Sequence, residues 1–188
     1  MKIKLILTCL VIMTNILNGF SNEQNKNILI VYGSFSGSTK EIADSMSIYL
    51  TKNSNTVDVL AAEKIRIDLS KYDLIIIGSA IHGDNPHPKI FDFINTNKDG
   101  LNKKKIAIFI VCGTITSTKK NKRDNALTYP DKIGKGLNPI SKVVFAGNMP
   151  SSGKKFDEFL AKHLLGIVTG DFRDWVKIKN WVKDVARM

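Results

Sequence analysis

The sequence has few of the residues that staple a small domain or bind a metal ion. Its 188 residues include only two cysteines, Cys9 and Cys112, which excludes a disulfide framework. It has no Cys-x-x-Cys or His-Glu-x-x-His motif, and its histidines, His82, His87 and His163, do not have metal-ligand spacing. We therefore predict a domain without structural disulfides and without a metal site.

Acidic residues are also scarce, with 17 Asp and Glu against 28 Lys and Arg. The imbalance is concentrated in residues 98–155, which contain 13 basic and three acidic residues. Such a block attracts an acidic redox partner, an anionic membrane surface or a carboxylated substrate, unless it is only a solvated face. Nucleic acid is not expected, because the block lacks interleaved aromatic residues and known nucleic-acid-binding motifs.

The first 21 residues differ from the rest. Lys2 and Lys4 precede an apolar run over residues 5–13, and small residues follow at 19–21. This pattern is typical of a secretory signal peptide, and a membrane anchor or a buried N-terminal strand are the alternatives. We expect an exported or membrane-associated protein, with the cytoplasmic face of the membrane as the alternative location.

Residues 27–188 contain no repeat or linker, and their hydrophobic content is ordinary for one soluble domain. Short apolar runs predict strands, and stripes at helical spacing predict helices between them. This alternation specifies an α/β fold: a doubly wound five-stranded parallel sheet of order 2-1-3-4-5, with helices on both faces. The predicted strands are 28–32, 56–60, 74–78, 105–112 and 142–146. The predicted helices begin near residues 38 and 88 and cover the stripes at 156–167 and 175–185.

One long connection, residues 114–141, does not fit the alternation. It is rich in Lys, Asn, Gly and Thr. Residues 119–128 are expected to be helical, and the chain that follows is expected to be broken by Pro130, Gly134, Gly136 and Pro139. Connections of this length in a compact domain are usually functional or mobile.

A hydroxyl-rich loop follows the first strand directly: Ser34-Phe35-Ser36-Gly37-Ser38-Thr39. A loop of this kind at a helix N-terminus is suited to bind phosphate, because free N–H groups and the helix dipole favour an anion. Neither a Walker loop nor a dinucleotide fingerprint matches its spacing. The alternative is a serine-rich cap that serves only its own helix.

The loop and the strand pattern resemble flavodoxins over essentially residues 27–188. The resemblance implies that FMN is the cofactor, with its phosphate in residues 34–39 and its ring between two further loops. Those loops supply the remaining predicted cofactor-binding residues: Ala80, Ile81, His82 and Gly83 after the third strand, and Cys112, Gly113 and Thr114 after the fourth. In this arrangement His82 either stacks on the ring or is an ordinary surface residue. His87 is predicted to be a turn or helix-capping residue, and Cys112 to be buried.

The chain is basic and has no Trp or Tyr in either ring loop, unlike simple electron-carrier flavodoxins. It is more similar to the flavodoxin-fold protoporphyrinogen oxidases, the quinone-linked dehydrogenases of bacterial haem synthesis. The similarity lies in residues 78–94, in a long basic insertion and in Val168–Asp174 followed by Trp181. It implies an FMN-dependent oxidoreductase that needs no catalytic side chain, takes a small-molecule substrate or quinone, and meets the membrane through its basic insertion.

An export signal conflicts with this function, because a chain exported unfolded does not carry FMN with it. Either FMN is captured outside, or residues 1–21 are an anchor, or the reaction differs. The alternative function is an FMN electron-carrier module that docks an acidic redox partner. A more distant one is a flavin-free interaction domain.

Overall fold

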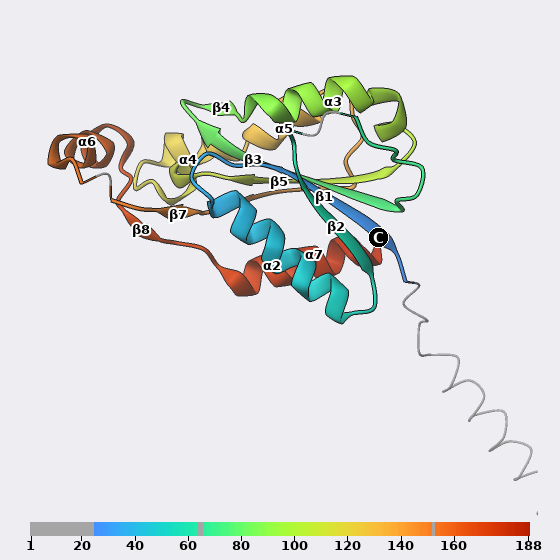
Figure 1. The fold of residues 1–188 in the computed structure, drawn as a ribbon. Coiled ribbons are helices and arrows are strands. Elements are labelled where there is room, and N and C mark those ends of the chain that lie inside the picture. The colour runs from blue at the N-terminus through green and yellow to red at the C-terminus, as the bar shows by residue number, and fades with distance from the viewer. Residues whose placement is uncertain (1–24, 64–65, 152) are drawn as a thin grey trace, which may run out of the picture.

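The apolar runs of the sequence form a central parallel sheet. The structure, a computed structural model, describes residues 25–63, 66–151 and 153–188, so the prediction for residues 1–21 lies outside it. Within the described residues, five parallel strands are arranged in the order β2-β1-β3-β5-β6 (Figure 1). This confirms the predicted order. The strands are β1 Asn27–Gly33, β2 Thr56–Ala61, β3 Leu74–His82, β5 Lys105–Val111 and β6 Ser141–Phe145.

β3 continues beyond Gly78, which was its predicted end. Gly78 does not stop the strand but makes room for a neighbour: a Cβ there would lie 2.1 Å from Cζ of Phe109, its partner on β5. The strand then folds back into β4, Asn85–Pro86, which pairs with it in antiparallel fashion. Gly83 and Asp84 form the turn with φ of 54° and 62°, as a type I′ hairpin requires.

Helices cover both faces of the sheet, as predicted (Figure 1). Because side chains alternate along a strand, Ile28 and Ile30 pack toward one pair of helices and Leu29 and Val31 toward the other group. The first face carries α2 Ser38–Lys52 and α7 Trp175–Arg187, and the second carries α3 Pro88–Leu101, α4 Lys120–Ala126 and α5 Tyr129–Gly134.

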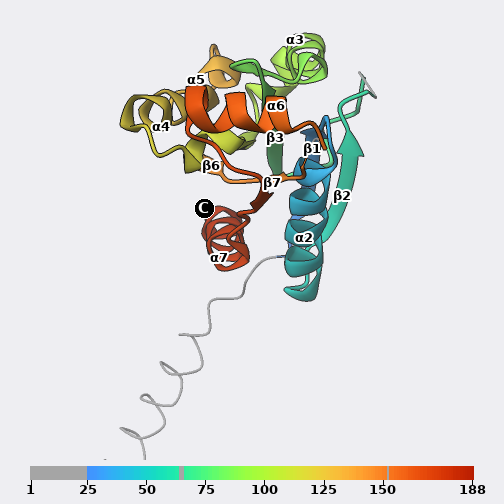
Figure 2. The ribbon, with the colours of Figure 1, turned by 90° about the vertical axis from the view of Figure 1, so that its left-hand side faces the viewer.

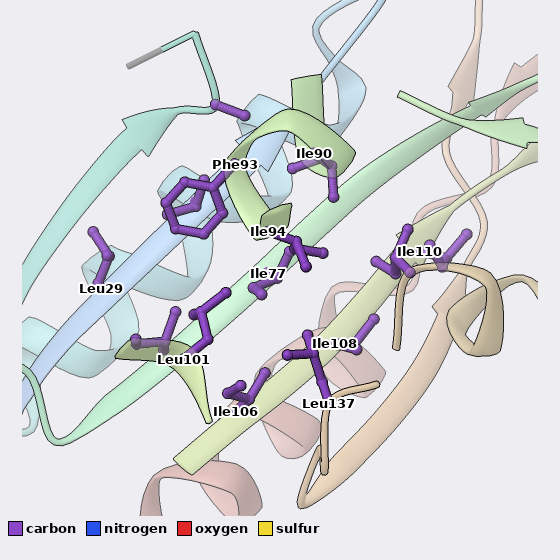
Figure 3. Close-up of a cluster of buried hydrophobic side chains, with 14 of the residues drawn as sticks. Leu29, Ile77, Ile90, Phe93, Ile94, Leu101, Ile106, Ile108, Ile110 and Leu137 are labelled. Carbon is purple, nitrogen blue, oxygen red and sulfur yellow. The ribbon is translucent and has the colours of Figure 1, made fainter. Parts of the chain in front are cut away.

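Figure 3 shows the core on the second face, where α3 lies against the sheet. Ile90 and Phe93 of α3 are fully buried and belong to the same cluster as Ile77 and Ile108 of the strands. Complete burial of a side chain of this size stabilises the fold by about 1.5–3 kcal/mol. This packing holds the carboxyl ends of the strands, and the loops that follow them, in fixed positions.

The helix expected over 119–128 is present as α4, but the chain after it was wrongly expected to be broken at Pro130. α5 begins at Tyr129, so Pro130 occupies the first turn, where a missing N–H costs nothing. Ala126, Tyr129, Ile133 and Leu137 are all buried in the second-face core. The segment is therefore an ordinary crossover that covers the sheet.

The connection between β6 and α7 leaves the body of the domain. β7 Asn148–Met149 pairs in antiparallel fashion with β8 Gly170–Asp171, and α6 Lys155–Leu160 runs on into a π-helical turn, Ala161–Leu165. We call residues 153–169 the arm. A helix forms on the predicted stripe, but it does not cover the sheet: Phe159 and Leu164 are 55% and 61% exposed. In both ribbon views α6 lies beyond the carboxyl ends of the strands (Figures 1 and 2).

Only one of the two tryptophans of α7 packs in the core. Trp181 contacts Phe109 and Phe145, with ring centroids 6.2 and 5.8 Å away, whereas Trp175 is 42% exposed. No helix among the described residues is both long enough and apolar enough to cross a membrane.

Candidate functional site

The three loops predicted to bind a cofactor meet at one edge of the sheet. β1, β3 and β5 are parallel neighbours, and their last residues are in register, with Gly33 beside Ser79 and Ala80 beside Val111. The loop 34–39, the hairpin after Ala80 and the segment from Cys112 to Thr114 therefore leave the sheet side by side. Figure 2 views the molecule from this end of the strands.

The backbone of the hydroxyl-rich loop leads directly into the N-terminus of α2. Gly37, the residue before the helix, has a φ of 93°, a conformation that glycine adopts without strain. Its carbonyl accepts the first helical bond, from Glu41 N. The N–H groups of Ser38, Thr39 and Lys40 therefore have no acceptor within the helix.

The four hydroxyls of this loop are not equivalent. Ser34 Oγ accepts from Gly37 N at 3.0 Å and shapes the loop itself. Ser38 Oγ accepts from Asn148 N at 2.9 Å and ties the loop to β7. Thr39 is 1% exposed, and its Oγ1 has no hydrogen-bond partner among the described residues. Ser36 is exposed at the surface.

The unpartnered Thr39 hydroxyl indicates what the loop fits. A buried hydroxyl without a partner costs about 1–3 kcal/mol, and native structures rarely leave one in that state. Together with the free N–H groups of the first turn, it makes a donor set that suits a phosphate oxygen. The loop is therefore more than a cap for its own helix, because none of its hydroxyls caps α2.

An aromatic cluster that the sequence did not reveal lies next to this loop. Phe35 is 52% exposed, and its ring centroid lies 4.4 Å from that of His87 and 5.6 Å from that of His82. The residues are about fifty positions apart in sequence, so no spacing signal connects them. Phe35 thus places an aromatic ring of the loop 34–39, which we call the phosphate loop, against the first ring loop, residues 80–83.

His87 occupies the predicted cap position of α3, but its side chain makes no capping bond. The backbone N–H of His87 donates to Ser79 Oγ and Ala80 O. Its ring fills the space above Gly33, where a Cβ would lie 2.7 Å from the His87 Cβ. Burial lowers the pKa of His87, and Nδ1 has no partner among the described residues. The imidazole is consequently held neutral at physiological pH.

The first ring loop, residues 80–83, forms the tip of the β3–β4 hairpin, and the crossover between β5 and β6 is bonded to this tip. Ala80 and Ile81 are half-buried, whereas His82 and Gly83 are exposed. The buried hydroxyl of Tyr129 donates to Asp84 Oδ1, and Lys132 Nζ donates to Asp84 O at 2.6 Å. Burial is the main reason that the pKa of Tyr129 is raised, so the hydroxyl remains a donor.

The second ring loop packs beneath the base of the arm. A Cβ on Gly113 would lie 2.1 Å from Met149 Sδ, so a larger residue there would require the Met149 side chain to move. Thr118 N donates to Gly166 O at 3.1 Å, and Lys119 Nζ donates to His163 O at 2.8 Å. Cys112 is buried as predicted, and burial raises its pKa to about 11. It is therefore a neutral thiol, and not a nucleophile, near pH 7.

The basic block does not form one surface. Lys103–Lys105 lie where β5 begins, at the opposite edge of the sheet from the loops, and Lys104 Nζ binds the carbonyls of Ser70 and Tyr72. Lys119 and Arg123 lie at the loop edge, but they are bound to backbone carbonyls. Two further loop-edge cations of the block are Lys120, which is exposed and pairs with Asp124, and Lys122, which is half-buried.

A cavity of about 290 Å³ adjoins the phosphate loop on the side of β2, and Ser34, Lys40, His87 and Lys89 contribute to its lining. A larger cavity, about 570 Å³, lies at the far edge around Leu69 and Lys104. In the described part of the chain, no group of three or more His, Cys, Asp or Glu side chains is placed to hold a metal ion.

Comparison with known proteins agrees with this geometry. A family model described as the flavodoxin domain matches residues 29–163. The solved structure of oxidised flavodoxin 1 from Bacillus cereus has a TM-score of 0.58 at 18% identity, covering 86% of this chain and 97% of that one. Flavodoxin 2 from the same organism has a TM-score of 0.55 at 23% identity, with coverage of 85% and 97%.

A third solved structure, the two-electron reduced flavodoxin of Megasphaera elsdenii, has a TM-score of 0.54 at 15% identity and covers 86% of this chain and 99% of its own. At these identities the likeness shows a shared fold. None of the curated proteins matches the sequence.

Proposed function

This chain belongs to the flavodoxin domain family, which indicates FMN as its cofactor, and from that premise we propose that it is an FMN-dependent electron-transfer oxidoreductase. When bound, FMN supplies the group that accepts and donates electrons. The protein binds it, orients it and controls its access to solvent and to partners.

The unpartnered hydroxyl of Thr39 carries the proposal. Thr39, Ser36 and the N–H groups of the first turn of α2 would hold the phosphate. The ring would lie between residues 80–83 and 112–114, with Phe35 and His82 as aromatic neighbours. No side-chain nucleophile is required, and Cys112 is too strongly protonated to be one.

The test is an FMN titration followed by flavin fluorescence. Each lost hydrogen bond to a charged phosphate costs about 1.5–3 kcal/mol, so Ser36→Ala combined with Thr39→Ala should raise the Kd at least about 100-fold. Thr51→Ala, on an exposed turn of the same helix, is the matched control and should bind FMN normally. Unchanged affinity in the double variant, or a folded parent protein that binds no FMN, contradicts the proposal.

Within this class, we propose a quinone-linked dehydrogenase of the protoporphyrinogen oxidase type. Besides the sequence similarity, the arm favours it: Phe159, Leu164 and Val168 are exposed, and the arm is bonded to Thr118 and Lys119, which follow the second ring loop. An exposed apolar surface at a redox centre suits a flat apolar reactant such as a porphyrin or a quinone.

Anaerobic turnover separates this activity from simple electron carriage. FMN-loaded protein supplied with protoporphyrinogen and a quinone should produce porphyrin fluorescence in step with loss of the quinone, and protein without FMN should not. If neither substrate reacts, the electron-carrier function with an acidic protein partner becomes the better proposal. In that case salt should slow electron exchange with the partner.

We also propose that Lys120 and Lys122 contact an anionic membrane surface or an acidic redox partner, and that residues 1–21 direct the protein to an exported or membrane-associated location. Lys120→Gln with Lys122→Gln should reduce sedimentation with anionic vesicles at low salt. Lys52→Gln with Lys103→Gln changes the charge equally at the opposite edge and should not. Lys119 and Arg123 are poor targets because their bonds hold backbone segments together. Equal sedimentation of both variants argues against the membrane contact.

A further inference from the structure

A cluster of three charged residues lies beside the phosphate loop. Arg173, in the segment between β8 and α7, donates a hydrogen bond to Glu41 in the first turn of α2. It also donates two bonds to Asp171, from Nε at 2.8 Å and from Nη2 at 2.6 Å. The two carboxylates therefore share one guanidinium.

The position of Glu41 relates this cluster to the cofactor. A Cβ built on Gly37, the loop residue that precedes α2, would lie 3.9 Å from Glu41 Oε1. A carboxylate at that distance from the loop stands close to the place where a phosphate would bind. Like charges at short range repel, so Glu41 opposes phosphate binding unless its charge is compensated.

Arg173 is held where it can provide that compensation. Its side chain is only 8% exposed, and its guanidinium lies 4.7 Å from the ring centroid of Trp175. The guanidinium also keeps the pKa of Asp171 below its ordinary value. Because arginine stays protonated in proteins, the cluster retains this positive charge throughout the physiological range.

We propose that Arg173 is a positioning residue that raises the affinity for the cofactor's phosphate by neutralising Glu41. The inference rests on the proposed function, because it needs a phosphate in the loop 34–39. It goes beyond it by assigning a role to a residue that lies 132 positions from its partner and outside all three predicted loops. Arg173 acts through Glu41 and not through a contact with FMN.

The experiment compares FMN with riboflavin, which lacks the phosphate. Arg173→Gln should raise the Kd for FMN about 3- to 30-fold at low salt, a range typical of partly exposed charges, and leave the Kd for riboflavin unchanged. The loss should shrink as salt is added. Lys179→Gln removes the same charge from an exposed site on α7 and serves as the control.

A second substitution keeps the test decisive if Arg173→Gln also loosens the base of the arm. Glu41→Gln in the Arg173→Gln background should restore most of the FMN affinity, because the uncompensated charge is gone. Equal losses for FMN and riboflavin, or no recovery in the double variant, would show that Arg173 is only structural and overturn the inference. A different result would overturn the phosphate-loop assignment itself: a parent protein that binds FMN no more tightly than riboflavin.

Discussion

The two long connections after β5 and β6 both contain short helices, but only the first covers the sheet. The crossover buries Tyr129 and Ile133 in the core, whereas the arm exposes Phe159 and Leu164. The difference lies in how the ends are fixed. The crossover must pass over one face to join two parallel neighbours, but the arm begins and ends at a two-residue antiparallel pair, Asn148–Met149 with Gly170–Asp171. An apolar stripe therefore predicts a helix, and the attachment of its ends decides what the helix covers.

The largest expected effect is a loss of folding stability when a buried side chain of the crossover is truncated, compared with an exposed side chain of the arm. Tyr129→Ala empties a fully buried site and should lower the free energy of unfolding by about 3–5 kcal/mol. Phe159→Ala removes a ring of similar size from an exposed site and should change it by less than about 0.5 kcal/mol. Urea unfolding of both variants checks the pair, and similar losses would contradict the comparison.

A smaller change separates the packing of Tyr129 from its hydrogen bond. Tyr129→Phe keeps the ring but removes the donor to Asp84, and should cost about 1–2 kcal/mol. Hydrogen exchange at the amides of Gly83 and Asp84 should become faster, because the hairpin tip loses one of its two ties to the crossover. Tyr49→Phe, whose ring lies beneath Lys179, is the control. Unaltered exchange at the tip would mean that Lys132 alone holds it.

The smallest expected effect concerns Cys112, which belongs to the core cluster and not to the arm. A variant without the arm replaces residues 150–169 by Asn-Gly, so that Met149 is joined to Gly170, in a Cys9→Ser background. In this variant Cys112 should react with Ellman's reagent at pH 8 as slowly as in the intact chain. Rapid reaction would show that the arm protects the thiol.

The same thiol predicts how stability depends on pH in the alkaline range. Its folded pKa of about 11 exceeds the unfolded value near 9.0, so the unfolded state loses its proton first. The stabilising contribution is complete below pH 9.0 and should be lost as pH rises toward about 11. Cys112→Ser should remove this part of the pH dependence in urea unfolding curves.

The parts of the fold that depend on local pattern were predictable from sequence. Runs such as Leu74–Ile77 indicated buried strands, and the loop 34–39 directly after β1 indicated where an anion would bind. The pairing of Phe35 with His87 and of Glu41 with Arg173 was not predictable, because these partners meet only after the strands assemble. The different hydrogen bonding of the loop hydroxyls was not predictable for the same reason. Ser38 and Thr39 are equivalent in the sequence, and they differ only because Asn148 N donates to Ser38 Oγ in the folded chain.

The β7–β8 pair has a consequence for how such a protein diversifies. Asn148 and Asp171 are direct partners, so whatever joins them starts and finishes at nearly the same point in space. Lengthening such a loop adds little closure entropy, and neither a strand nor a buried side chain has to move. The edge of the sheet that carries the three loops therefore also carries an attachment point at which segments of different length and polarity can be exchanged while the sheet stays as it is.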